Sequence, residues 1–380
     1  MFERGACGME SILTGEQWAA AAALRHQLHR RPELSGREEG TLAALTAFLE
    51  EHTSFTPERR GQWFYAYREG VGQPIAFRAE MDALPMTEGG ALPYASQNKG
   101  AAHKCGHDGH CAALCALAMA VENGAVKRPV YLIFETGEEI GLGGELCAPL
   151  LAEKGIREVY AFHNLSGYPM GAVVYRRGLT QPASEGLSLQ LRGTPSHASA
   201  PEEGKNPAPE IARLTLSAQG LNRRDGAEMK MCTVTGVKVG SGDFGISPGE
   251  GELRVTLRAE RESAMKDMEV ALVNEARSLA EKAGLQMQYR LWDVFPETRN
   301  DDACLDKVIS AAGRLGIQAV EMADIWRASE DFGHLLKACP GALFYIGTGE
   351  GHAPVHTDGY DFPDEILSVA VNMFVELAKG

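Results

Sequence analysis

Four short apolar stretches of this chain each lead into a cluster of acidic or imidazole side chains. The stretches have the length and β-forming composition of strands, with helical patterns between them, and cover residues 74–78, 129–134, 158–162 and 342–347. Strands that alternate with helices favour a parallel sheet. The sequence therefore predicts an α/β fold with a mixed, mostly parallel sheet.

Three helices are expected around this sheet. An alanine-rich segment from Glu16 to Arg31 is ended by Pro32, and Arg37 to Glu51 has a second helical pattern. An apolar run at residues 111–121 predicts a third helix, just after a turn that contains glycine.

Ligand-type residues follow each predicted strand. Open α/β sheets bind ligands in the crevice beyond the carboxyl ends of their strands, so these residues are expected to gather there. They are Glu80 and Asp82, Glu138 and Glu139, His163 and Asn164, and His352 and His356. Their recurrence at four strand ends indicates a functional site.

A thiol and two imidazoles occur within six residues, at Cys105, His107 and His110. Residues two apart do not share a helix face, so Cys105 and His107 converge only if the chain turns at Gly106. Asp108 is expected to cap the helix that follows. This arrangement predicts a metal site on a strand-to-helix loop.

Residues 181–293 follow a different pattern. Alternation of apolar and polar residues at 186–192, 233–239 and 252–258 predicts antiparallel strands, and 207–217 and 265–283 are helical in pattern. This order fits a ferredoxin-like α+β unit. We expect it to be inserted into a discontinuous catalytic domain formed by 1–180 and 294–380.

Composition excludes several classes of protein. The 380 residues carry a net charge of -14, which argues against nucleic-acid binding, and no apolar stretch approaches a membrane span. The N-terminus lacks the apolar core of a signal peptide, so a cytoplasmic location is predicted. The eight cysteines show no disulfide spacing, and Met9 is an alternative start.

The ligand-type residues permit metal-dependent hydrolysis. Cysteine, histidine and carboxylate together suit manganese, zinc, nickel or cobalt. Of the adjacent pair Glu138 and Glu139, one can bind metal while the other takes a proton from water. Asp82 can orient a ligating histidine. The candidate ligands are Cys105, His107, Glu139, His163 and His356.

Motifs over nearly the whole chain resemble a known family. They include residues 77–85, 103–110, Glu138-Glu139, His163, 193–201, 329–332, Pro340-Gly341 and Val355-His356. The chain resembles the metal-dependent amidohydrolases, which include aminoacylases, hippurate hydrolase and the plant indole-acetyl-amino-acid hydrolases, within the carboxypeptidase–aminoacylase superfamily. It departs from them at Glu80, where aspartate is usual, and at Glu135-Thr-Gly137, where Gln-Pro-Ala is usual.

The resemblance implies roles for individual residues. Cys105 would bridge two divalent metal ions, and the other four candidate ligands would complete their shells. Glu138 would be the general base and His197 would stabilise the oxyanion, in its own or in a partner subunit. Arg258, by its position, and Asn164 are candidates for substrate binding. The resemblance also implies that the inserted domain, residues 181–293, is a lid and dimerisation domain through which the chain forms a homodimer.

The predicted reaction is cleavage of the amide bond of an N-acyl amino acid or similar conjugate. Three alternatives stay open at this point. They are a dipeptidase or carboxypeptidase with the same metals, an N-carbamoyl amino-acid hydrolase, and a binding or regulatory protein that retains the fold without catalysis.

Overall fold

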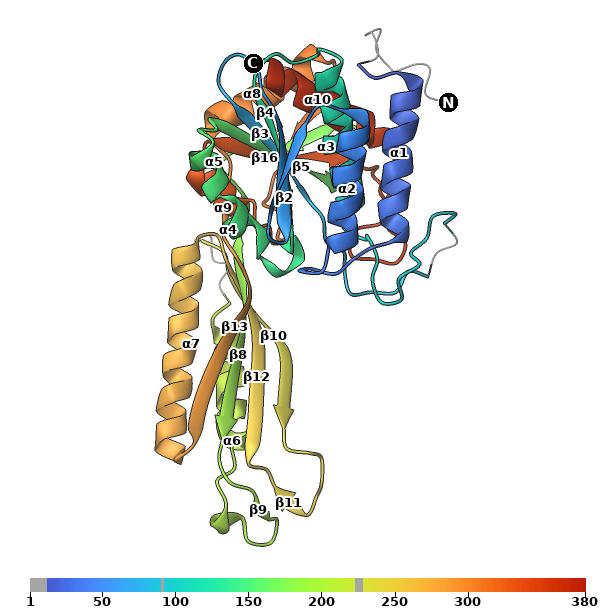
Figure 1. The fold of residues 1–380 in the computed structure, drawn as a ribbon. Coiled ribbons are helices and arrows are strands. Elements are labelled where there is room, and N and C mark those ends of the chain that lie inside the picture. Colours follow the sequence, from blue (N-terminus) through green and yellow to red (C-terminus); the bar gives the residue numbers. More distant parts are fainter. Residues whose placement is uncertain (1–11, 90–91, 223–227) are drawn as a thin grey trace. The chain divides into compact units, whose positions relative to one another are not determined.

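The chain divides into two compact units in a computed structural model, which describes residues 12–89, 92–222 and 228–380 (Figure 1). Unit 1 comprises the chain up to Thr180, Thr298–Ile325 and Glu330–Gly380, and unit 2 comprises Gln181–Glu297 and Trp326–Ser329. Met9 lies outside the described residues. No helix within the described ranges is long and apolar enough to cross a bilayer.

Unit 1 is built on a sheet in which eight strands are described, in the order β1-β2-β4-β3-β5-β16-β6-β15. Its central strands β4, β3, β5 and β16 are parallel, whereas β1, β2 and β4 pair antiparallel. The bounds are Thr56–Arg60 (β1), Trp63–Arg68 (β2), Ile75–Glu80 (β3), Val130–Glu135 (β4), Glu158–Leu165 (β5), Val173–Tyr175 (β6), Ala319–Glu321 (β15) and Gly341–Gly347 (β16). This sheet confirms the predicted mixed, mostly parallel α/β class.

Helices cover the sheet of unit 1, with α1 to α3 on one side and α4, α5 and α9 on the other (Figure 1). The bounds are Gly15–Arg30 (α1), Glu39–His52 (α2), His107–Glu122 (α3), Gly143–Cys147 (α4), Pro149–Glu153 (α5), Asp302–Arg314 (α8), Gly333–Ala338 (α9) and Glu365–Lys379 (α10). The first helix begins in a capping box between Thr14 and Gln17, as its sequence permits. Of these helices, α1, α2, α3, α8 and α10 contribute residues to one continuous apolar core with the sheet.

The central helix α3 is buried from His107 to Val121, because α1 and α10 pack on it from outside. The central strands β3 and β4 are likewise buried along their full length. Helices and strands that are buried all round explain the long apolar runs in the sequence. They also leave the ends of these elements as the places where polar groups can gather.

Unit 2 is a four-stranded antiparallel sheet in the order β10-β12-β8-β13, with two helices that share its apolar core. The chain passes through Ala183–Arg192 (β8), Ala208–Gly220 (α6), Lys230–Val239 (β10), Glu250–Ala259 (β12), Glu262–Ala283 (α7) and Gln286–Phe295 (β13). A two-stranded piece, β9 (Ser196–His197) with β11 (Ile246–Ser247), carries a predicted site residue. Among the shorter elements, Pro201–Glu203 (η2) belongs to unit 2, whereas Glu138–Ile140 (η1), Thr298–Arg299 (β14) and most of Leu179–Gln181 (β7) belong to unit 1.

Candidate metal centre

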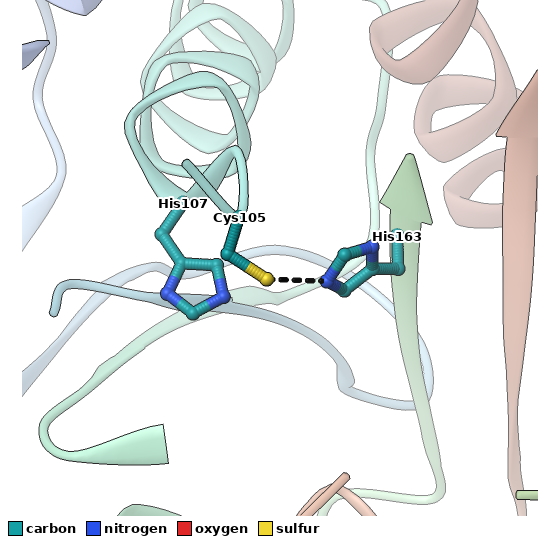
Figure 2. A group of neighbouring side chains, drawn as sticks. All are labelled: Cys105, His107 and His163. Carbon is teal, nitrogen blue, oxygen red and sulfur yellow. Dashed lines mark hydrogen bonds between the residues drawn. The ribbon is translucent and has the colours of Figure 1, made fainter. Parts of the chain in front are cut away.

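The turn before α3 brings Cys105 and His107 together. Gly106 has φ +101°, a conformation in which an added Cβ would lie 2.2 Å from the amide oxygen of Asn164. The tight turn therefore depends on glycine for its backbone angle and for its space. Cys105 and His107 offer ligand atoms within 4.8 Å of each other and of His163. Figure 2 shows these three side chains next to one another.

Asp108 does not cap α3, which corrects the sequence prediction. The helix begins at His107, its N-cap is Gly106, and no side chain makes a capping hydrogen bond there. The carboxylate of Asp108 instead lies in the first turn, 2.8 Å from Nδ1 of His29. A negative charge in the first turn still interacts favourably with the helix dipole.

The Cys105 sulfur lies at the centre of the ligand-type residues. It is 3.4 Å from Nε2 of His163, which is on β5, and 3.3 Å from Nε2 of His356 (Figure 2 shows the first contact). The same His356 nitrogen is 3.4 Å from Oε1 of Glu139, which follows β4. The structure thus brings together groups from the turn, two strand ends and the loop after β16.

His107 is oriented by Asp82. Its Nδ1 lies 3.0 Å from the Asp82 carbonyl oxygen and 3.2 Å from Oδ1. Burial opposes a charge on this ring, but the Asp82 hydrogen bond and the charge of Glu80 outweigh it and raise the pKa of His107 to about 10. Carboxylates that stabilise a proton on the ring also favour a cation at Nε2.

Glu138 lies beside the ligand-type residues, with Oε2 3.9 Å from Nε2 of His107. Burial, followed by the charges of Glu330 and Glu139, raises its pKa well above the usual value. A carboxylate with a raised pKa is suited to accept a proton and later to release it.

These residues fit a divalent cation on three observations. A tetrahedral zinc ion places sulfur and nitrogen ligands about 3.5 Å apart, close to the contacts of Cys105. Nε2 of His107 is buried and has no hydrogen-bond partner among the described residues. Burial and the charges of Glu139 and Glu138 raise the pKa of the Cys105 thiol. Coordination to a cation would lower this pKa again, because a thiol that binds a metal loses its proton.

A buried cluster around Arg78 lies close enough to Glu138 to act on its charge, and no role is predicted for this cluster from the sequence. The guanidinium contacts Glu80 and Glu135, and its Nη2 lies 2.8 Å from Glu330 Oε1 and 2.6 Å from Asp331 Oδ1. The sequence does carry a signal for this cluster: Arg78 is a charged residue within a predicted buried strand, and a buried charge requires partners of opposite charge.

Asn164, a predicted substrate-binding residue, supports the turn through its side chain. Its side chain is fully buried, and its Nδ2 donates to the Cys105 carbonyl at 3.0 Å. Its oxygen lies 2.7 Å from Nε2 of His110, whose Nδ1 is 2.6 Å from Glu80 Oε2. Both ends of the amide are thus occupied by protein groups.

Two predicted site residues lie in unit 2. His197 is exposed on β9, and its Nδ1 accepts a hydrogen bond from the Ser199 amide at 3.1 Å. The neutral ring therefore carries its proton on Nε2. Arg258 is partly buried on β12 and donates to the Arg327 carbonyl at 3.0 Å and to Ser329 Oγ at 2.8 Å.

We expect Gly106→Ala to lower the free energy of unfolding of the metal-free protein. A non-glycine residue in this backbone region costs about 1–3 kcal/mol. The clash with Asn164 adds to this cost, as does the Tyr360 hydroxyl, which lies 2.9 Å from the added Cβ. Urea denaturation of the two proteins measures the difference.

Gly313→Ala is the matched control for this substitution. Gly313 lies in α8, where no described atom is within 4 Å of an added Cβ, so alanine there is expected to be neutral or stabilising by about 0.5–1 kcal/mol. Equal stability of Gly106→Ala and the unsubstituted protein would contradict the role assigned to the turn.

Buried groups that can share metal ions, next to a glutamate of raised pKa, define a class of protein: a metal-dependent hydrolase on an α/β sheet. Comparison with known proteins then identifies the family. Residues 76–380 match the model of peptidase family M20/M25/M40, and the chain belongs to that family.

Individual relatives agree with this assignment. The chain is 28% identical over 369 residues to an N-acetylcysteine deacetylase of Bacillus subtilis, covering 93% of this chain and 95% of the relative. It is 28% identical to a hippurate hydrolase of Campylobacter jejuni, covering 93% and 94%. A solved dinuclear metal binding peptidase of the M20 family from Bacillus subtilis superposes with a TM-score of 0.79 at 26% identity, covering 96% and 98%. These matches confirm the predicted resemblance and the predicted hydrolase class.

Proposed function

We propose that this chain hydrolyses the amide bond of N-acyl amino acids, or of similar N-acyl conjugates, to a carboxylic acid and a free amine. The observation that carries the proposal is the contact of one thiol, Cys105, with two imidazoles, next to Glu138. The relatives named above include a deacetylase of N-acetylcysteine and a hydrolase of hippurate. Both names describe N-acyl amino acids as substrates.

Two divalent ions are the proposed cofactors, with manganese, zinc, nickel and cobalt as candidates for their identity. Cys105 is the proposed shared ligand, and His107, Glu139, His163 and His356 are the proposed remaining ones. Support comes from two ligand groups with Cys105 in common: one with His107 and His163, the other with Glu139 and His356. Such ions polarise a carbonyl and lower the pKa of water.

The protein's own groups would then move the protons. Glu138 would accept a proton from the attacking water and deliver it to the departing amine, as its raised pKa favours. Asp82 would hold His107 in one orientation through the contact at Nδ1. We also propose that the Nε2–H of His197 donates to the developing oxyanion, in its own or in a partner subunit.

Further expectations belong to the same proposal. Unit 2 is proposed as a ferredoxin-like lid and dimerisation domain, in support of which its elements follow the order β8-α6-β10-β12-α7-β13. Substrate binding by Arg258, a homodimer and a cytoplasmic location stay predictions.

The test is to measure metal content and then hydrolysis of a panel of N-acyl amino acids and dipeptides, with each candidate metal added in turn. About two metal ions per chain and metal-dependent release of a free amino acid from N-acetyl or N-benzoyl substrates are expected. Hydrolysis restricted to substrates with a free α-amine would replace the proposal with a dipeptidase. Release of ammonia from N-carbamoyl amino acids would replace it with a carbamoyl hydrolase, and absence of bound metal under every loading condition would refute the centre.

A further inference from the structure

Two basic residues of α1 reach the turn that carries the proposed ligands. Arg25 and His29 are fully buried, although they belong to an N-terminal helix far from this turn in sequence. Arg25 Nη1 lies 3.3 Å from Oδ2 of Asp108, and His29 Nδ1 lies 2.8 Å from the same oxygen. Asp108 directly follows His107, so both contacts bear on the first turn of α3.

His29 is held between two carboxylates. Its Nδ1 faces Asp108, and its Nε2 lies 3.1 Å from Oε1 of Glu88. Ionised carboxylates only accept hydrogen bonds, so this geometry favours the cationic ring, in which both nitrogens donate. Burial opposes this charge, but the hydrogen bonds to Asp108 and Glu88 outweigh it and raise the pKa of His29.

The same cluster extends to Lys104, the residue before Cys105. The Lys104 ammonium contacts Glu88, and it donates to the carbonyl of Tyr360 at 2.8 Å. The Lys104 carbonyl accepts from the backbone N–H of His356 at 2.7 Å. The segment on the amino side of the turn is therefore tied to the loop that carries His356.

Arg25 also holds the far end of that loop. Its Nη1 is 3.1 Å from Asp361 Oδ1, and its Nε is 2.5 Å from Asp364 Oδ1, just before α10. The guanidinium carbon of Arg25 lies 4.5 Å from the centre of the Tyr94 ring. The Tyr94 hydroxyl in turn donates a hydrogen bond to Asp361 at 2.6 Å. One arginine thus bridges the first turn of α3 and the loop after β16.

We propose that Arg25 and His29 are positioning residues that hold Cys105, His107 and His356 in the geometry that binds metal; this inference rests on the metal centre of the proposed function. The other two proposed ligands are placed differently. His163 lies on β5, and Glu139 follows β4 and donates its backbone N–H to Asp82 at 3.0 Å. Arg25 and His29 therefore act on the ligands carried by the turn before α3 and by the loop after β16.

The test compares His29→Gln and Arg25→Gln with Arg30→Gln. Arg30 is the matched control, because it lies on the same helix and, within the described part of the chain, its side chain donates only to the carbonyl of Pro93, at 3.4 Å in an exposed contact. Zinc affinity is measured by calorimetric titration of the metal-free proteins. His29→Gln and Arg25→Gln are expected to bind zinc about 10- to 100-fold more weakly, as is usual for groups that orient ligands. Arg30→Gln is expected to match the unsubstituted protein.

A second readout follows the thiolate directly. Loading with cobalt gives an absorption band from sulfur coordination, so a displaced Cys105 is expected to weaken or shift this band in the two variants. A role confined to folding would lower the melting temperature and leave both the zinc affinity and the cobalt band unchanged in folded protein. Thermal melts followed by circular dichroism identify a temperature at which every variant is folded, and metal binding is measured at that temperature.

A double variant tests the route of the effect. If His29 acts through Asp108, then His29→Gln combined with Asp108→Asn should bind zinc no more weakly than the worse single variant, because coupled residues are not additive. Additive losses would overturn this route. Should Arg25→Gln fail to fold, His29→Gln, which keeps a polar side chain of similar size, carries the test.

The two levels of the proposal fail in different ways. Unchanged zinc affinity and an unchanged cobalt band in folded His29→Gln and Arg25→Gln would overturn the positioning role alone. Failure of the unsubstituted protein to bind zinc or cobalt would refute the metal centre, and the positioning role with it.

Discussion

Glu138→Gln is expected to lower kcat for amide hydrolysis by about 10²- to 10⁴-fold while both metal ions stay bound. Glutamine keeps the size of the side chain but cannot accept a proton at the oxygen that faces His107, 3.9 Å away. Glu139, the proposed ligand, is left in place. Activity should therefore be lost without loss of metal.

The measurement pairs initial rates at saturating substrate with metal analysis of the same sample. Glu145→Gln is the control, because Glu145 is an exposed glutamate in the neighbouring helix α4 and should leave kcat unchanged. Full activity of Glu138→Gln would show that another group is the base. Loss of metal together with activity would instead make Glu138 a ligand.

Cys105→Ala is expected to remove at least one of the two metal ions per chain and to abolish hydrolysis. The sulfur makes the contacts with both His163 and His356, at 3.4 and 3.3 Å, so its loss separates the two groups of ligands. Thiolate ligands also supply much of the affinity of a site for zinc and similar metals.

Cys115→Ala is the control that tests whether the loss of metal and activity follows from removing any buried thiol. Cys115 is fully buried in the middle of α3, ten residues further along, and no metal-ligand group includes it among the described residues. It should keep both metal ions and full activity at a small cost in stability. A Cys105→Ala protein with two metal ions and normal kcat would exclude Cys105 as the shared ligand.

The class of fold, and most of the residues that gather in the candidate site, could be predicted from the sequence alone. Strands such as β3 and β4 are buried on all sides, so most of their residues are apolar, and that apolar run is visible in the sequence. Because parallel strands end at one edge, the polar residues after them had to meet there. Gly106 could also be predicted as a turn, since Cys105 and His107 cannot converge on a helix.

Tertiary structure alone decided what each polar group contacts. Asp108 has the chemistry of a helix cap and was predicted to be one, yet its carboxylate contacts His29, 79 residues earlier in the chain. Asn164 follows a ligand-type histidine but is buried against the Cys105 carbonyl. Arg25 contacts Asp361 across 336 residues. Periodicity and spacing report local geometry, whereas a buried charge is satisfied by whichever partner the packing brings near.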